Sequence, residues 1–409
     1  MPYNGIRTIK WTVHNLYKSA IVVIKNLRSN PSISHFLLKE MLGFRNKKKP
    51  NQEHLKCAVD WIIEGVKETN NKGVAAFYSL INGWSPGYYE TTGYIIPTLF
   101  EVSKLKKRQY LSDYAIQLLD WEVKNQRDSG GMPSGLVGDE TYNRNPLVFD
   151  SGQVLFGLLS GFRETGSLKY LQAAKNVGQF LIGSLDSNGS YSKHMYLDQL
   201  HTYDIRVSWA LLLLAKETAD YAYLEAVERN LSWTLEQQLR NGFFLHNSFQ
   251  KNQPVITHLL GYTLRGLTEC GLILEREEIL TAVNLVLERL LEDIEKYGSL
   301  AGAYSTDWSG EYNWTCLTGN CQIAIVFHRM AKNYNKINQE IYLGAFRKLL
   351  QIVKSSQIID QKLHGICGGI FGSYPIWGDY MKFSVINWAT KFFIDALLLE
   401  MHDRGGTWG

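Results

Sequence analysis

The chain repeats one pattern, an apolar helix followed by an amphipathic one, along most of its length. Asn145–Ser192 shows the unit: a predicted helix opens at Asp150, a tight turn falls at Glu164-Thr165-Gly166, and a second helix runs from Leu168 to about Leu185. A helix that is apolar on every side is buried, and an amphipathic helix covers it. Helical pairs that cannot bury their apolar faces alone close or stack into an array.

Six such pairs can be traced along the sequence. The amphipathic, outer helices are predicted near residues 53–69, 109–126, 168–184, 222–239, 276–293 and 340–356. The nearly apolar, inner helices are predicted at Thr91–Val102, Ser151–Phe162, Ile205–Lys216, His258–Glu269, Gly319–Met330 and Ser384–Glu400. Six outer and six inner helices in alternation predict an all-α fold, the (α/α)6 toroid or six-hairpin barrel.

The connections between these helices differ in length. Those that lead into the inner helices are long, whereas those that lead out of them are short turns such as Glu164-Thr165-Gly166. The inner helices then run parallel, so their N-termini and the long loops share one rim, where function is expected. Helix N-termini carry a partial positive charge, and an acidic glycan would suit this field.

Residues 1–50 differ in charge from the rest of the chain. They hold ten Lys or Arg and one acidic residue, Glu40, whereas residues 51–409 hold 33 basic and 38 acidic side chains. Trp11–Ser29 and the shorter Phe36–Phe44 have helical spacing, so a basic amphipathic helical arm is predicted before a toroid domain at 51–409. Such an arm is suited to a membrane surface or a partner such as a glycosyltransferase, or it lies solvated along the body.

Other features narrow the class of protein. No signal peptide or membrane-spanning run is evident, and five cysteines, an odd number, suggest reduced thiols. These features predict a cytoplasmic protein, which the arm would allow to lie at the inner face of the membrane. Phosphate-loop, dinucleotide-binding and nucleic-acid-binding motifs are missing, so neither a cofactor nor a nucleic-acid partner is predicted.

Polar residues concentrate where the predicted inner helices begin. Glycosidic cleavage uses two carboxyl groups, while lyase or epimerase chemistry needs a side chain that moves a proton and cations that stabilise an enolate. The predicted catalytic residues are Glu90, Asp150, His201, Asp204 and His258. The predicted substrate-binding residues are Trp84, Tyr88, Arg144, Arg206, Asp307, Trp308, Trp377 and Asp379, with Arg144 or Arg206 engaging the anionic group of the sugar.

Structural roles compete with these assignments. Asp150-Ser151-Gly152-Gln153 has the form of a capping box, and Asp204 could likewise cap the helix that follows it. Glu90 is freer, because the threonines that follow it could cap instead. A histidine near a helix start is often hydrogen-bonded without any part in chemistry, which applies to His201 and His258.

A zinc site is the weaker alternative. Cys316 and Cys321 are followed by His364 and Cys367, and lanthionine synthetase-like zinc enzymes, which are also α/α toroids, hold zinc with two Cys and one His at comparable places. The resemblance is imperfect, because His364 precedes Cys367 and Cys321 would lie inside a helix. Buried thiols are the ordinary state of free cysteine, so no metal is predicted.

Several segments carry a resemblance to a known family. They are Tyr89–Pro97, Phe149–Gln153, Cys316–Asn320, Gly368–Pro375 and Asn387–Phe393. From about Asn51 onward the chain resembles exopolysaccharide- and capsule-cluster proteins with (α/α)6 toroids, of the Vibrio polysaccharide cluster type. More distantly, the toroid is similar to those of uronyl epimerases, polysaccharide lyases and unsaturated glucuronyl hydrolases.

The resemblance and the site residues lead to one main hypothesis. It is a carbohydrate-active enzyme of cell-surface polysaccharide biosynthesis, a hydrolase, lyase or epimerase that acts on an acidic sugar or glycan at the long-loop rim. An oligosaccharide or polysaccharide is the expected partner. The alternative is a non-catalytic glycan-binding or scaffold protein of the synthesis machinery, and the zinc enzyme is the second alternative.

Overall fold

The protein folds as an α/α toroid, as predicted. The computed structural model describes residues 31–42 and 49–403, and within them the outer and inner helices alternate along the chain. The outer helices are α3 (Asn51–Glu68), α5 (Gln109–Asn125), α8 (Leu168–Ser184), α10 (Tyr221–Glu236), α12 (Glu277–Tyr297) and α14 (Gln339–Ser356). The inner helices are α4 (Tyr89–Lys106), α7 (Val148–Thr165), α9 (Ile205–Thr218), α11 (Thr257–Leu274), α13 (Leu317–Asn333) and α15 (Asn387–His402).

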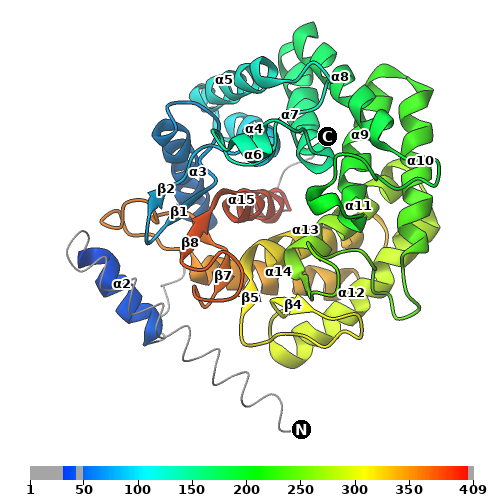
Figure 1. The fold of residues 1–409 in the computed structure, drawn as a ribbon. Coiled ribbons are helices and arrows are strands. Elements are labelled where there is room, and N and C mark those ends of the chain that lie inside the picture. Colours follow the sequence, from blue (N-terminus) through cyan, green and yellow to red (C-terminus); the bar gives the residue numbers. More distant parts are fainter. Residues whose placement is uncertain (1–30, 43–48, 404–409) are drawn as a thin grey trace.

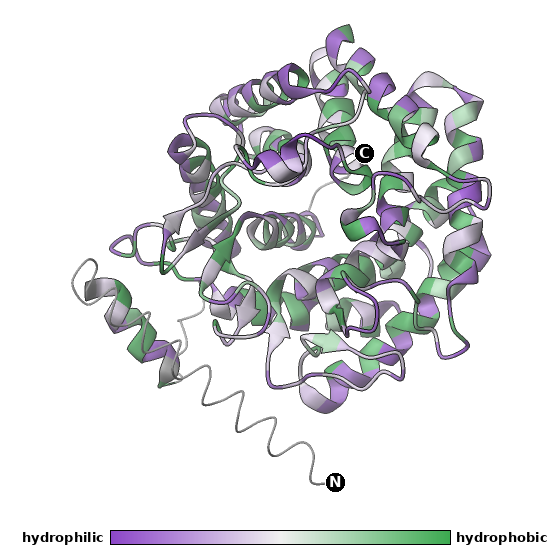
Figure 2. Ribbon diagram, in the orientation of Figure 1, coloured by the Kyte–Doolittle hydropathy of each residue, from purple (hydrophilic) through white to green (hydrophobic). Residues whose placement is uncertain are grey.

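The inner helices form a closed ring. Each packs against the next in the order α4, α7, α9, α11, α13 and α15, and α15 returns to contact α4 (Figure 1). The outer helices surround them, and Figure 2 shows that hydrophilic residues follow the outward faces of the outer helices. Along α12 the buried Ile279, Val283, Val286 and Leu290 recur every three or four residues, which is the spacing of one helix face.

Two inner helices approach closely through glycine. A Cβ on Gly93 of α4 would lie 2.4 Å from Cα of Val154 on α7, and a Cβ on Gly157 would lie 2.4 Å from the carbonyl oxygen of Gly93. These distances are far below van der Waals contact, so only glycine allows the two backbones to meet here. The contact brings the first turns of α4 and α7 together at the long-loop rim.

The helix starts differ from the prediction in a way that matters for the site. Helix α7 begins at Val148 and follows Leu147, so Asp150 lies inside the first turn and does not cap the helix. Gln153 does not complete a capping box either, because its Oε1 accepts a hydrogen bond from Arg206. Helix α4 begins at Tyr89, which places Glu90 in its first turn. Asp150 is therefore free of the capping role that the sequence suggested, and Glu90, as expected, does not cap its helix.

Short strands, which the sequence analysis did not predict, join the long loops at the rim. An antiparallel sheet has the order β2-β1-β8-β6, and two further pairs are β3-β4 and β5-β7. The strands are β1 (Phe77–Ser79), β2 (Gly83–Trp84), β3 (Val255–Ile256), β4 (Ala303–Tyr304), β5 (Thr315–Cys316), β6 (Ile370–Phe371), β7 (Ser373–Tyr374) and β8 (Ser384–Ile386). Phe77 pairs with Ile386, so this sheet joins the first and last helical pairs of the ring. The predicted final helix thus begins at Asn387, because residues 384–386 belong to β8.

Part of the basic arm packs on the ring. Helix α2 (Pro31–Met41) begins and ends earlier than the Phe36–Phe44 segment predicted for it. Ile33, Phe36 and Leu37 are buried, and the Phe36 ring stacks on Phe371 of β6 with centroids 6.0 Å apart. The predicted Trp11–Ser29 helix lies outside the described residues. None of the described helices is both long and apolar enough to cross a bilayer.

Candidate active site

A cavity of about 440 Å³ opens at the N-terminal ends of the inner helices. Its floor comes from the first turns of four of them: Glu90 and Thr91 on α4, Phe149 and Asp150 on α7, His258 and Leu259 on α11, and Trp388 on α15. Its walls come from the long loops, including Phe77, Gly135, Leu136, Asp139, Tyr142, Tyr196, Tyr203, Phe249, Tyr380 and Met381. The predicted long-loop rim therefore contains the cavity.

Glu90 is buried in this cavity beside the phenol of Tyr88, which also lines it. Burial raises the pKa of Glu90 to about 7, against the opposing effects of a hydrogen bond with Tyr88 and the positive charge of Arg206. A carboxyl group with a pKa near 7 exchanges its proton readily at neutral pH. Glu90 is therefore suited to accept or donate a proton.

Asp150 faces the same cavity from α7. One carboxylate oxygen, Oδ2, accepts a hydrogen bond of 3.3 Å from the backbone N–H of Gly135. Burial first, and then the neighbouring charge of Glu90, raise its pKa well above the ordinary value, and the Gly135 hydrogen bond only partly opposes them. Two buried carboxyl groups that repel each other cannot both ionise easily, so the pair retains a proton at neutral pH. Such a pair can supply one acid and one base.

His258 lies in the cavity floor as a neutral ring. Its Nδ1 lies 3.0 Å from Oε1 of Gln322, and burial lowers its pKa to about 3. Because the amide oxygen of Gln322 only accepts, Nδ1 is assigned as the protonated nitrogen and Nε2 as the acceptor. His258 can accept a hydrogen bond from a sugar hydroxyl, but it is not an acid at neutral pH.

Three predicted residues of the third helical pair are buried and do not line the cavity. His201 is buried with Nε2 3.1 Å from the carbonyl oxygen of Tyr196, and its ring stacks on Tyr203 at 4.5 Å. Asp204 is buried without a hydrogen-bond partner for either carboxylate oxygen among the described residues, and burial raises its pKa well above the ordinary value. Arg206 is 3% exposed and does not line the cavity. These positions suit support of the wall better than contact with substrate.

The remaining predicted binding residues lie away from the cavity lining. Trp84 packs against Trp61 with centroids 5.1 Å apart, and Trp308 is buried with its indole N–H donating to the carbonyl oxygen of Asn241. Arg144 is exposed and pairs with Glu140. Asp307 accepts hydrogen bonds from Ser309, Asp379 pairs with Lys382, and Trp377 is half-buried against the core. The sequence shows that they belong to rim loops but not which way they point.

The cysteine and histidine residues of the zinc alternative do not assemble. Cys316 and Cys321 are buried at the start of α13, whereas Cys367 lies beside Cys57 of α3. The described residues contain no group of three or more His, Cys, Asp or Glu side chains that could hold a metal ion. The residues of this weaker alternative therefore do not form a zinc site.

Several residues of the site escaped the sequence analysis. Tyr262 and Trp388 lie in the cavity, and Gln322 holds His258 from the neighbouring helix. The four-residue interval from His258 to Tyr262 could have indicated that Tyr262 belongs to the site, since residues four apart share a helix face.

Glu122 of α5 is wholly buried with both carboxylate oxygens unpartnered among the described residues. It is close enough to Asp150 for the charge of Asp150 to raise the pKa of Glu122 further. The sequence did not predict the burial of Glu122, because it lies within the amphipathic pattern of an outer helix, where charged residues are expected to face water.

Comparisons with known proteins bear on the fold. No family model and no curated protein sequence matches the chain. The solved structure of unsaturated glucuronyl hydrolase from Bacillus sp. GL1 is similar, with a TM-score of 0.68 at 11% identity over 85% of this chain and 96% of that one. The Streptococcus agalactiae enzyme of the same name gives 0.67 at 11% identity over 91% and 96%.

A protein described as a novel alpha-amylase from Clostridium perfringens gives a TM-score of 0.63 at 15% identity, over 87% of this chain and 99% of that one. At such identities the likeness shows a shared fold, and the chemistry of this chain must be argued from its own residues. The chain therefore has the α/α toroid of these glycan-active proteins.

Proposed function

We propose that the protein is a carbohydrate-active hydrolase that cleaves a glycosidic bond in the cavity at the long-loop rim. One observation carries this proposal: Glu90 and Asp150, on adjacent helices, face one cavity lined by aromatic rings, and burial raises the pKa of both. Two carboxyl groups with different proton affinities are the equipment of glycoside hydrolysis. Structural neighbours with hydrolase names support the proposal at the level of the fold.

The environments of the two carboxyl groups assign their roles. Asp150 has Glu90 as a like-charged neighbour and retains its proton, so it serves as the general acid toward the leaving oxygen. Glu90, whose pKa is about 7 and which feels the positive charge of Arg206, is ionised in part at neutral pH and serves as the base that activates water. Tyr88 orients Glu90, and His258 accepts a sugar hydroxyl.

The walls suit a sugar ring. Tyr196, Tyr203, Phe249 and Trp388 present aromatic surface to the cavity, and such faces cover the apolar side of a pyranose. We propose an acidic sugar at the reacting position, because the N-termini of α4, α7 and α11 open into the cavity and favour an anion. Neither Lys nor Arg is among its described lining residues, so backbone and hydroxyl donors would hold the acidic group. One neighbour was solved in complex with dGlcA-GalNAc6S, an acidic disaccharide.

Substitution of the two carboxyl groups tests the mechanism. Asp150→Asn and Glu90→Gln should each lower kcat by about 10²–10⁴-fold, because an amide neither donates nor accepts the required proton. Their melting temperatures should equal or exceed that of the native protein, because an amide costs less to bury than a carboxylate. Asp113→Asn on the outer face of α5 is the matched control and should remain fully active.

The substrates of this test come in pairs. Oligosaccharides that end in a uronic acid and their carboxyl-reduced, neutral counterparts separate the hydrolase proposal from the acidic-sugar proposal. Turnover of the neutral member alone would refute the acidic sugar and leave the hydrolase standing. Tight binding without turnover by the native protein would refute the hydrolase and favour the non-catalytic glycan-binding alternative, as part of polysaccharide synthesis or otherwise.

A further inference from the structure

A second layer of polar side chains lies inside the ring, one helical turn beyond the residues that form the cavity floor. An α-helix advances about 6 Å in four residues, so a residue three or four positions beyond a cavity residue lies one turn deeper on the same face. Tyr94 of α4, Tyr262 of α11 and Lys391 of α15 have this relation to Glu90, His258 and Trp388. Arg206 of α9 joins this layer, as its contacts show.

The guanidinium of Arg206 is enclosed by aromatic rings. Its Cζ lies between 5.0 and 5.9 Å from the centroids of Phe156, Tyr262, Trp209, Phe392 and Tyr94. Its Nε donates to Oε1 of Gln153 at 2.7 Å. Among the described residues, its two terminal NH₂ groups have no hydrogen-bond acceptor, and no carboxylate lies within ion-pair distance. A guanidinium has five N–H donors, so four of them have no hydrogen-bond partner in the part of the chain that the structure describes.

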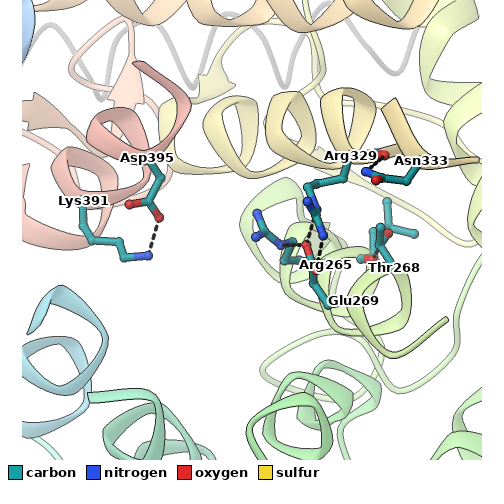
Figure 3. Close-up of polar contacts among 8 residues, drawn as sticks. Arg265, Thr268, Glu269, Arg329, Asn333, Lys391 and Asp395 are labelled. Atoms are coloured by element: carbon teal, nitrogen blue, oxygen red, sulfur yellow. Dashed lines mark hydrogen bonds and ion pairs between the residues drawn. The ribbon is translucent and has the colours of Figure 1, made fainter. Parts of the chain in front are cut away.

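The nearby carboxylates are already engaged. Lys391 pairs with Asp395, which also accepts a 2.8 Å hydrogen bond from Oγ1 of Thr98. Farther along the ring interior, Arg265 and Arg329 share one carboxylate, that of Glu269, at Nε–Oε1 distances of 2.9 and 2.8 Å (Figure 3). Among the described residues in this part of the ring, the cations Arg206, Lys391, Arg265 and Arg329 thus accompany the carboxylates of Asp395 and Glu269. Glu90 is the carboxyl group on the cavity side, and it is only partly ionised at neutral pH.

An unpaired buried cation of this kind is costly. Burial lowers the pKa of Arg206 only to about 10, so the side chain remains charged at neutral pH. Aromatic faces offset part of the desolvation through cation–π attraction, but they leave the N–H edge of the guanidinium without acceptors. Lys391 has three N–H donors and donates one of them to Asp395. Its Nζ also lies 5.4 and 4.5 Å from the ring centroids of Tyr94 and Phe392, two of the rings that surround Arg206. Arg206 has no carboxylate partner among the described residues, and Lys391 keeps two N–H donors beyond the one that it gives to Asp395, so both cations can donate to a further acceptor within the ring.

We propose that Arg206 and Lys391 bind a small inorganic anion, chloride in the cell, inside the toroid beneath the cavity floor. A monatomic ion suits the place, because the walls are aromatic and the hydroxyls of Tyr94 and Tyr262, 3.5 Å apart, are the other donors at hand. The site adjoins the proposed active site through Tyr262, which lines the cavity, but neither Arg206 nor Lys391 lines it. The proposal goes beyond the hydrolase function and does not depend on it.

Bromide replaces chloride and can be located by its anomalous scattering, so the native protein tests the proposal directly. Crystals grown without halide and soaked in sodium bromide should show an anomalous peak at hydrogen-bond distance from the terminal nitrogens of Arg206. A water molecule at that place, with bromide only on exposed surfaces, would overturn the proposal.

Thermal unfolding supplies a second, independent test. The melting temperature should rise and saturate as sodium chloride replaces sodium gluconate at constant ionic strength, because an ion that binds only the folded state stabilises it. Arg206→Gln should abolish this rise, and Lys391→Gln should weaken chloride binding about tenfold or more, which keeps the test valid if the first variant does not fold. Arg163→Gln, which removes an exposed partner of Glu217, is the control and should titrate like the native protein. An equal rise in all variants, or none in the native protein, would contradict an internal anion site.

Discussion

Gly93 sets the separation of the two helices that carry the proposed acid and base, and its replacement by alanine is the most informative perturbation. The added Cβ would lie 2.4 Å from Cα and 2.8 Å from the backbone nitrogen of Val154. Carbon atoms in contact are normally about 3.5–4.0 Å apart, so α4 and α7 must separate by about 1 Å. Neither neighbouring atom belongs to a flexible side chain that could rotate away.

The expected cost follows from two opposing effects. Overpacking a close contact lowers the free energy of unfolding by about 1–3 kcal/mol. Replacing glycine by alanine inside a helix raises it by up to about 1 kcal/mol. We therefore expect Gly93→Ala to lower the free energy of unfolding by about 1–2 kcal/mol. Activity should suffer more, because Glu90 and Asp150 lie within one turn of the contact and a displacement of about 1 Å can reduce turnover about 100-fold.

Urea denaturation and steady-state kinetics measure the two effects on the same preparation. Gly344→Ala in outer helix α14 is the matched control, because nothing lies within 4 Å of its added Cβ. That variant should be as active as the native protein and equally or more stable. If Gly93→Ala proved as stable and as active as Gly344→Ala, the close contact would not set the geometry of the site, and the reasoning would fail.

Three further predictions concern protonation and ring closure. If Glu90 is the base, turnover should fall about tenfold per pH unit below about pH 7. The reason is that burial raises the pKa of Glu90 to about 7 and that only its carboxylate form accepts a proton. A pH–rate profile whose activity falls only below about pH 4 would exclude this role. Glu122 is buried without a hydrogen-bond partner among the described residues, and burial raises its pKa well above 4.5. The folded protein therefore binds the proton of the Glu122 carboxyl group more tightly than the unfolded chain does. The free energy of unfolding should accordingly fall as the pH rises above 4.5. Glu122→Gln should remove this loss and be more stable than the native protein near pH 8, as measured by denaturation across pH; an unchanged slope would contradict the assignment. Asn387→Ala should cost about 2 kcal/mol, because the amide of Asn387 donates to the carbonyl oxygen of Ala75 at 3.0 Å and to Oγ1 of Thr91 at 2.7 Å; calorimetry would test this, and a cost below about 0.5 kcal/mol would show that these hydrogen bonds contribute little.

Local periodicity predicted the architecture because helix burial leaves a direct trace in sequence. Outer helices such as α12 have one apolar and one charged face, whereas inner helices such as α11 are mostly apolar and are buried on every side. Their alternation leaves few folds besides a ring. The short strands left no such trace, because strands of two or three residues are too brief to show a period. Their pairing depends on where the ring brings distant loops together.

The site was harder to predict for a related reason. Position at the start of an inner helix brought Glu90, Asp150 and His258 to one cavity, as the sequence analysis expected. The same rule failed to separate these from Asp204 and Arg206, which lie at the start of α9 but do not line the cavity. Side-chain direction depends on the rotation of each helix about its axis, and that rotation is set by tertiary contacts such as the one at Gly93. A local pattern does not specify it.

The pairing of β1 with β8 has a consequence for how the chain reaches this structure. Helical pairs with local contacts can form as the chain is synthesised. The pairing of Phe77 with Ile386 cannot form until more than three hundred further residues have been synthesised, so the ring closes late. Until then the apolar flank of α4 that α15 will cover stays open to the surroundings. We therefore expect ribosome-bound chains that lack α15 to bind chaperones through this flank.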